Sequence, residues 1–370
     1  PMSRRKPQST SLARRPPQPE PEARREPRGV RGWRLAALGS AAALLLLALG
    51  AWLGAGLVAD AEQRRCAERY RFINTAFACG VRPILGKGGY VGLRTELLRL
   101  AEAEAAAGRA SSIAIFFRDL RNGPIFGVNE LSSFAPASLL KLPLVLAYMN
   151  AEENVPGFIE RKVSYSGGID APEQTIPAAE SVQPGREYAL QTLLRNTLVH
   201  SDNVSYLILR QYVRELTDGE ALVEQTYREL GIIPPEAPTD QTVSVQGYAS
   251  LFRQLHNATY LRPDLSELVL SWLAQSEFRD GLVAGVPAGV VVAHKFGERV
   301  ATGADGEHEV VEFHDCGIVY YPDNPYVLCV MTRGRELGAL VQIVRGISKR
   351  VYDEVDGRRA APTGAAWGAG

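Results

Sequence analysis

The chain has 370 residues, and its 41 Lys and Arg residues balance its 41 Asp and Glu residues, which leaves a formal net charge of zero. This balance argues against a protein-wide basic surface for nucleic acid. Hydrophobic residues make up 46% of the chain and charged residues 22%, as expected for a globular protein with a sizeable core. Four cysteines without a C-x-x-C pair exclude a disulfide-dense small scaffold and a zinc ribbon.

The N-terminal region is predicted to target the chain to a membrane. Residues 1–34 are proline-rich and hold ten Lys or Arg residues against three Glu residues. They contain too little apolar surface to offset their ordering entropy, so we expect a disordered tail. Residues 35–59 are all uncharged and long enough to cross a bilayer. We therefore predict an uncleaved transmembrane helix at 35–59. The alternative is a cleaved signal peptide, because Ala59-Asp60-Ala61 has the A-x-A form.

The basic flank also predicts orientation. By the positive-inside rule the N-terminus stays in the cytoplasm, and the chain after Asp60 lies outside it, with membrane lipid around residues 35–59. Gly50 and Gly54 form one G-x-x-x-G pattern, which indicates a weak homodimer, although small residues in an ordinary span give the same pattern.

The four cysteines fall into two pairs. Cys66 and Cys79 are expected just outside the membrane, where thiols can oxidise. Cys316 and Cys329 lie in apolar runs on either side of a turn signal, so they could face each other across a hairpin. Either pair could be a disulfide, and buried free thiols are an equally good interpretation.

Beyond the membrane the pattern indicates an α+β domain over residues 91–355. Residues 60–90 have mixed charge and a Gly-rich patch, as in a juxtamembrane connector. Apolar periodicity predicts a first helix at 93–107, a mostly helical middle at about 137–285 and a last helix at 337–353. Residues 356–370 are expected to be a disordered tail. Strands are predicted at residues 112–120, 124–128, 290–296, 309–321 and 326–333.

Three short motifs far apart in the chain carry the candidate chemistry. Ser138-Leu139-Leu140-Lys141 places a Ser and a Lys on one face of a helix start. Free backbone N–H groups there can hold an oxyanion, and a desolvated Lys near another cation can become the neutral base that activates the Ser. Ser201-Asp202-Asn203 follows a predicted helix, and Lys295-Phe296-Gly297 lies in a predicted strand. Together their order and spacing are far more specific than any one motif.

On these motifs, residues from about 90 to 355 resemble the catalytic domain of class A β-lactamases, within the penicillin-recognising serine hydrolases. The resemblance implies a five-stranded antiparallel sheet flanked by helices, an all-helical subdomain, and a site at their junction. It implies that Ser138 is the acylated nucleophile and Lys141 the base that takes its proton. Ser201 would pass a proton to the leaving nitrogen.

The resemblance also implies contacts with the substrate. Asn203 would bind the amide side chain and Lys295 the carboxylate. The backbone N–H groups of Ser138 and of Glu298, which follows Gly297, would form the oxyanion hole. No cofactor is expected, and no metal, because the histidines near residue 310 lack the H-E-x-x-H spacing.

Two departures from the family pattern affect the expected activity. Phe296 replaces the Thr or Ser whose hydroxyl contacts the substrate carboxylate, although we keep it among the substrate-binding positions. Glu236 is the candidate for the base that deacylates the enzyme, but Asp240 stands four residues later where the family has Asn. The surrounding segment is short for a full Ω-loop.

The leading hypothesis is a membrane-anchored, extracytoplasmic serine hydrolase of the class A β-lactamase type. It would open a β-lactam or a related amide through an acyl-serine. One alternative is a D-alanyl-D-alanine peptidase or penicillin-binding-type protein that acts on peptidoglycan peptides. The other is a sensor or scaffold domain with the same fold and little turnover.

Overall fold

The structure is a computed structural model that describes residues 28–79, 89–121, 123–232, 242–302 and 309–360. The chain divides into two compact units, residues 1–62 and residues 63–370.

The N-terminal helix is longer than the predicted span. Helix α1 (Arg28–Arg69) includes residues 28–34, expected to be disordered, and residues 60–69, expected to belong to the connector. The reason is local, because this stretch contains no proline and is rich in Ala, Leu and Arg, which are good helix formers. Within the described residues, one segment is apolar and long enough to cross a membrane, Leu44–Arg69, with a mean hydropathy of 1.9. An anchor and a signal sequence both fit this finding.

The connector is tied to the larger unit. A disulfide joins Cys66 to Cys79, which ends the short helix α2 (Thr75–Cys79), with their Cα atoms 5.7 Å apart. Backbone N–H groups of Arg71 and Ile73 donate to the carboxylate of Glu267, on α9 (Pro263–Leu273), at 2.7 and 3.1 Å. The connector is therefore docked on the domain. Residues 80–88 lie outside the described part of the chain.

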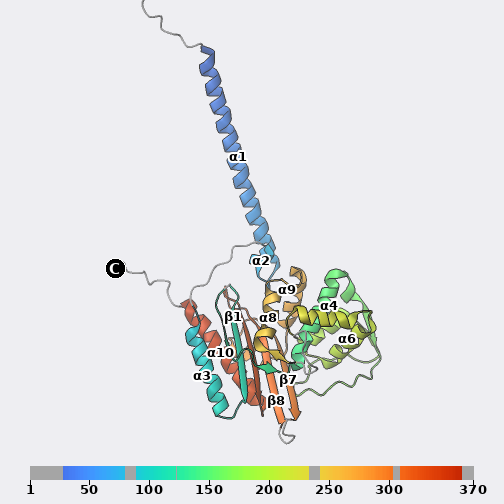
Figure 1. Cartoon of the computed structure of the whole chain (residues 1–370). Coiled ribbons are helices and arrows are strands. Elements are labelled where there is room, and N and C mark those ends of the chain that lie inside the picture. The colour runs from blue at the N-terminus through green and yellow to red at the C-terminus, as the bar shows by residue number, and fades with distance from the viewer. Residues whose placement is uncertain (1–27, 80–88, 122, 233–241, 303–308, 361–370) are drawn as a thin grey trace, which may run out of the picture. The chain divides into compact units, whose positions relative to one another are not determined.

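A five-stranded antiparallel sheet forms the centre of the larger unit, as predicted (Figure 1). Its order is β2-β1-β9-β8-β7, and β7 pairs with β8 along its whole length, so it runs six residues beyond its predicted end. The strands are β1 (Ser112–Asp119), β2 (Ile125–Val128), β7 (Val292–Thr302), β8 (Glu309–Val319) and β9 (Tyr326–Gly334).

Cys316 and Cys329 lie directly opposite each other on β8 and β9 and form a disulfide. Both cysteine pairs are therefore bridged, and the interpretation as free thiols is wrong. Two small sheets complete the strand structure. One pairs β3 (Ser133–Phe134) with β6 (Val243–Ser244), and the other pairs β4 (Lys162–Tyr165) with β5 (Arg186–Ala189).

Helices cover both faces of the sheet (Figure 1). On one face α3 (Val91–Ala106) and α10 (Leu337–Ala360) enclose an apolar core. The α10 helix continues past the predicted start of the tail, because Val351 and Val355 are buried in that core. The other face packs against the helical subdomain that the sequence predicted. Its helices are α4 (Lys141–Asn154), α5 (Leu190–Val199), α6 (Asn203–Glu215), α7 (Gly219–Glu229), α8 (Val245–His256) and α9.

Candidate active site

Ser138 lies in a tight turn that leads into a buried helix. The 3-10 helix η1 (Ala137–Leu140) runs directly into α4, whose first residue is Lys141. Ala137 has a φ of 50°, a left-handed conformation that costs free energy for a residue with a side chain and is common at functional sites. The surrounding structure must therefore hold the turn in place.

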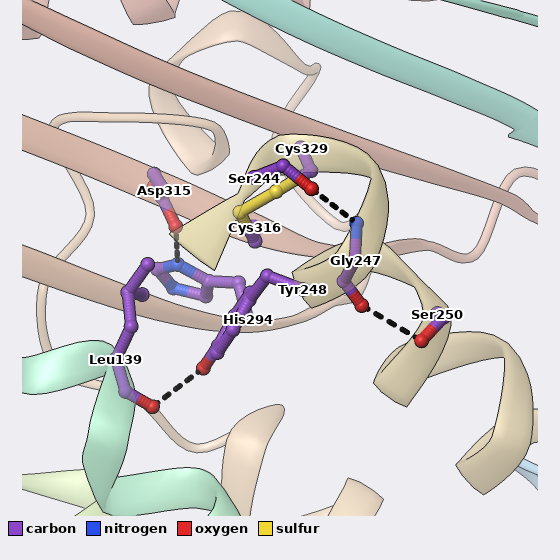
Figure 2. Close-up of a disulfide and its surroundings, with 9 residues drawn as sticks. All are labelled: Leu139, Ser244, Gly247, Tyr248, Ser250, His294, Asp315, Cys316 and Cys329. Carbon is purple, nitrogen blue, oxygen red and sulfur yellow. Dashed lines mark hydrogen bonds and ion pairs between the residues drawn. A yellow bond between two sulfur atoms is a disulfide. The ribbon is translucent and has the colours of Figure 1, made fainter. Parts of the chain in front are cut away.

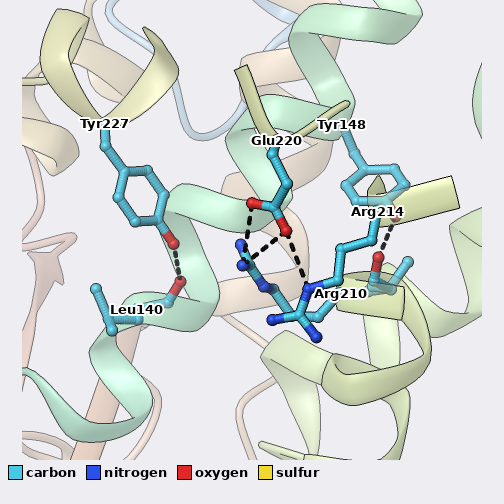
Figure 3. Close-up of polar contacts among 7 residues, drawn as sticks. Leu140, Tyr148, Arg210, Arg214, Glu220 and Tyr227 are labelled. Carbon is cyan, nitrogen blue, oxygen red and sulfur yellow. Dashed lines mark hydrogen bonds and ion pairs between the residues drawn. The ribbon is translucent and has the colours of Figure 1, made fainter. Parts of the chain in front are cut away.

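Two tyrosine hydroxyls from the helical subdomain hold this turn. Tyr248 on α8 donates to the carbonyl oxygen of Leu139 at 2.9 Å (Figure 2). Tyr227 on α7 donates to the carbonyl oxygen of Leu140 at 3.3 Å (Figure 3). These tyrosines lie 87 and 109 residues after the carbonyl groups that they bind, and the sequence carries no local signal for their role.

Strand β8 contacts the chain just before the turn through two side chains. The backbone N–H of Ala135 donates to Glu312 at 3.1 Å, and the Nε2 atom of His314 lies 2.9 Å from the Ala135 carbonyl oxygen. Burial lowers the pKa of His314 to about 4, so the ring is neutral near pH 7 and can donate from Nε2. Glu312 also pairs with Arg333, which holds its carboxylate in place.

The second motif is braced by its own aspartate. Ser201 has a φ of 55°, another left-handed residue, and precedes the start of α6. Asp202 caps this helix, with its side chain accepting from the backbone N–H groups of Val204 and Ser205 at 3.2 and 2.9 Å. The cap fixes the position of Ser201 and Asn203 on either side of Asp202.

The three motifs converge on the hydroxyl of Ser201. The Nζ atom of Lys141 lies 3.2 Å from Ser201 Oγ and 2.7 Å from Asn203 Oδ1. From β7, the Nζ atom of Lys295 lies 2.9 Å from the same Ser201 oxygen. The structure therefore brings together Lys141, Ser201, Asn203 and Lys295 from three distant parts of the chain. Ser138 lines the same cleft as Lys141.

Burial changes the charge of both lysines. Burial lowers the pKa of Lys141 to about 7, against the opposing effect of the negative charges of Asp202 and Glu298. Burial also lowers the pKa of Lys295 far below its usual value, and the charge of Lys141 lowers it further. Two cations beside one oxygen repel each other, which favours a neutral amine here near pH 7.

An open cleft of about 350 Å³ gives access to Ser138 and Lys141. Asn203 and Tyr206 line it on the α6 side, residues 298–300 line it from β7, and residues 172–175 complete it. Sequence reasoning missed residues 172–175 and Arg299, because no motif marks them and their place depends on the fold.

Strand β7 passes very close to the serine turn at Gly297. A Cβ atom on this residue would lie 3.1 Å from the backbone nitrogen of Leu139 and 3.2 Å from the carbonyl oxygen of Pro136. Only glycine allows this approach without a shift of backbone. The next residue, Glu298, lines the cleft.

Phe296 is a predicted substrate-binding residue whose side chain is buried away from the cleft. The Phe296 side chain is 3% exposed, and its ring lies 4.4 Å from that of Phe278 in the core on the α3 and α10 side of the sheet. Side chains alternate along a strand, so the Phe296 ring enters this core on the side opposite the candidate site. The Nζ atom of Lys295 still lies 4.3 Å from the centre of the ring. Glu236 lies outside the described residues.

The fold and the arrangement of these residues define a class of protein, and the comparisons agree. The sequence model of the β-lactamase enzyme family matches residues 93–355. This is more than half of the chain, so the protein belongs to that family and has the fold of the penicillin-recognising serine hydrolases.

Solved structures with this fold include both penicillin-binding proteins and β-lactamases. PBP-A is 21% identical with a TM-score of 0.58, and the match covers 74% of this chain and 99% of PBP-A. A class A β-lactamase from Mycobacterium abscessus is 20% identical with a TM-score of 0.59, with coverages of 71% and 99%. The extended-spectrum β-lactamase TLA-3 is 18% identical with a TM-score of 0.61, with coverages of 72% and 99%. No curated protein matches the chain.

Proposed function

We propose that this protein is a serine hydrolase of the class A β-lactamase type that opens a β-lactam or a related amide through an acyl-Ser138 intermediate. One observation carries the proposal. The Ser201 hydroxyl lies within hydrogen-bond distance of two buried amines, one of which, Lys141, shares the cleft with Ser138.

In the proposed reaction, neutral Lys141 takes the proton of Ser138 as its oxygen attacks the amide carbonyl carbon. The backbone N–H groups of Ser138 and Glu298 stabilise the negative oxygen of the tetrahedral intermediate. The C–N bond then breaks, and the leaving nitrogen takes a proton from Ser201, which recovers one from the lysines beside it. Water later attacks the acyl carbon, releases the acid and restores Ser138.

A penicillin-binding-type protein that acts on peptidoglycan peptides is the second candidate. The observation that favours it is the short connection between α7 and β6, residues 230–242, where the family carries the Ω-loop with its deacylating Glu. Glu236 is our candidate for that base. If it does not activate water, the acyl-enzyme persists and turnover is slow, which also suits a sensor or scaffold.

We further propose that α1 anchors the domain outside the cytoplasm, with the basic tail inside. Two disulfides support an oxidising location. Alkaline carbonate extraction should leave the chain in the membrane fraction, whereas a cleaved signal peptide would release a shorter, soluble protein. Residues 35–59 would contact lipid, and a dimer through Gly50 and Gly54 stays a prediction.

Intact-mass spectrometry tests the acyl-serine directly. The full chain in detergent is incubated with benzylpenicillin, and we expect a covalent adduct that peptide mapping places on Ser138. The matched variant Ser138→Ala should form no adduct and should unfold at the same temperature. An adduct on the variant, or none on a folded wild-type chain, would contradict the proposal.

The lifetime of the adduct separates the two enzymatic candidates. Rapid hydrolysis of the chromogenic cephalosporin nitrocefin, with no accumulated adduct, favours the β-lactamase. An adduct that lasts for hours favours the penicillin-binding type. In a sensor or scaffold, Ser138→Ala would leave the cellular phenotype of the gene unchanged.

A further inference from the structure

A short loop is tied to both sides of the cleft. We name residues 172–176 the strap. At its start, the carbonyl oxygen of Pro172 accepts from Nδ2 of Asn203 at 2.9 Å. At its end, the backbone N–H of Ile176 donates to Oε1 of Glu298 at 2.7 Å. The strap therefore runs from the α6 side of the cleft to β7.

The middle of the strap contacts the part of the site that is buried. Gln174 donates from Nε2 to the carbonyl oxygen of Ser201 at 3.2 Å. Ser201 and Lys295 are both 0% exposed, and neither belongs to the described residues that line the cleft. Ser138 and Lys141 do line it. One half of the site is thus open and the other half is closed.

The closed half holds groups that the proposed reaction needs. A leaving nitrogen must reach the Ser201 hydroxyl, and a substrate carboxylate must reach Lys295. The amide of Asn203, expected to bind the substrate, uses one of its two N–H donors on the strap. Because Ser201 and Lys295 have no exposed surface, a substrate can contact their side chains only after the strap moves.

Glu298 is suited to hold the strap in place reversibly. Its Oε1 atom binds the Ile176 N–H, but its Oε2 atom is buried and has no hydrogen-bond partner within the described part of the chain. A buried carboxylate oxygen without a partner is costly, so the closed state lacks the full stabilisation that a carboxylate can give. We propose that the strap is a gate, held closed by Glu298, whose opening admits substrate to Ser201 and Lys295. The nature of the substrate rests on the proposed function, but the gate does not.

Carbamylation with potassium cyanate can test the gate without any acylation of Ser138. A neutral amine adds its nitrogen to the carbon of cyanic acid, a proton moves to the nitrogen of the reagent, and a urea results. The full chain in detergent is treated with cyanate, and peptide mass spectrometry gives the rate at each lysine. Exposed Lys162 is the internal reference, because its side chain meets the reagent whether the strap is closed or open.

Two variants at one position form the matched pair. Glu298→Ala removes the acceptor of the Ile176 N–H, so Lys295 should react about tenfold faster relative to Lys162, the effect of losing one hydrogen bond to a charged group. Glu298→Gln keeps an acceptor and should change the ratio much less. Equal Lys295 rates in wild type and Glu298→Ala would overturn the gate. If Glu298→Ala does not fold, Gln174→Ala removes the middle contact and should raise the Lys295 rate in the same way.

The same proteins are also treated with benzylpenicillin. If Lys295 reacts faster in Glu298→Ala but no protein acquires an adduct on Ser138, the gate stands and the proposed function fails. If wild type forms the adduct but the Lys295 rate is the same in all variants, the function stands and the gate fails.

Discussion

The two faces of the five-stranded sheet carry different side chains, although the same strands supply both. Toward the helical subdomain they present buried Lys295, Glu312 and His314. Toward α3 and α10 they present mainly apolar residues. The buried polar residues on this side include Asp119, Thr332 and the pair His294 and Asp315, whose side chains lie 2.7 Å apart (Figure 2). Buried charges are costly even when paired. The apolar face therefore supplies stability, which allows the other face to hold the charged and polar groups of the candidate site.

The largest expected effect is on the rate of acylation, and it comes from the face that packs against the helical subdomain. Lys141→Ala should slow acylation of Ser138 by benzylpenicillin by about 10²- to 10⁴-fold, because a general base is lost. Lys141→Arg keeps a positive charge but cannot lose a proton, so it should be equally slow. Stopped-flow labelling with a fluorescent penicillin gives both rates. If Lys141→Arg kept the wild-type rate, a charge and not a base would be needed at this position.

On the face that α3 and α10 cover, a substitution should lower the stability of the fold without slowing the acylation of Ser138. Leu97 on α3 is fully buried, so Leu97→Ala should lower the free energy of unfolding by about 2–5 kcal/mol. The exposed residue Glu102 on the same helix is the control, and Glu102→Ala should change little. Chemical denaturation measures both. A Leu97→Ala protein that stays folded but acylates much more slowly would show that the two faces are not separate.

The pH dependence of acylation should reveal the base. Burial lowers the pKa of Lys141 to about 7, and the base must be neutral to take a proton. Acylation should therefore rise about tenfold per pH unit below about pH 7 and level off above it. Rates of Ser138 labelling across this range, at constant ionic strength, provide the profile. A rate that falls as the pH rises through 7 would require a protonated group in place of the base.

The smallest effect is expected far from both faces. Arg210 and Arg214 on α6 flank Glu220 on α7, at 3.2 and 3.1 Å (Figure 3). Glu220 is half exposed, and pairs of this kind contribute about 0.2–1 kcal/mol. Glu220→Gln should lower the unfolding free energy by no more than this, with unchanged acylation. A loss as large as that of Leu97→Ala would mean that this pair stabilises the subdomain more than solvent screening allows.

Much of the domain could be predicted because its signals are local. Apolar periodicity identified α3, α10 and the five strands, with errors mainly at their ends. Helix α1 and β7 both extended beyond the predicted bounds, since helix propensity and strand pairing continue past the apolar core of a segment. The sheet face that carries the Phe296 side chain could also have been predicted, because neighbouring residues in a strand, here Lys295 and Phe296, point to opposite faces.

Other parts of the site depend on contacts between distant residues. The two tyrosines at the serine turn, the hydrogen bonds of β8 to Ala135 and the contact of the strap with Glu298 all join segments more than eighty residues apart. The contacts of the strap with Ser201 and Asn203 span about thirty residues. Their residues have ordinary local surroundings in the chain. The pairing of Cys316 with Cys329 likewise followed from the register of β8 and β9.

By itself, the sequence determined the kinds of chemical group, their order along the chain and the helices or strands that carry them, because those depend on neighbours a few residues apart. Tertiary structure alone decided that Ser201 lies between two amines, that burial brings the pKa of Lys141 to about 7, and that the strap covers part of the site. Distance and desolvation exist only once the chain is packed, since both depend on which distant segments exclude water from one another.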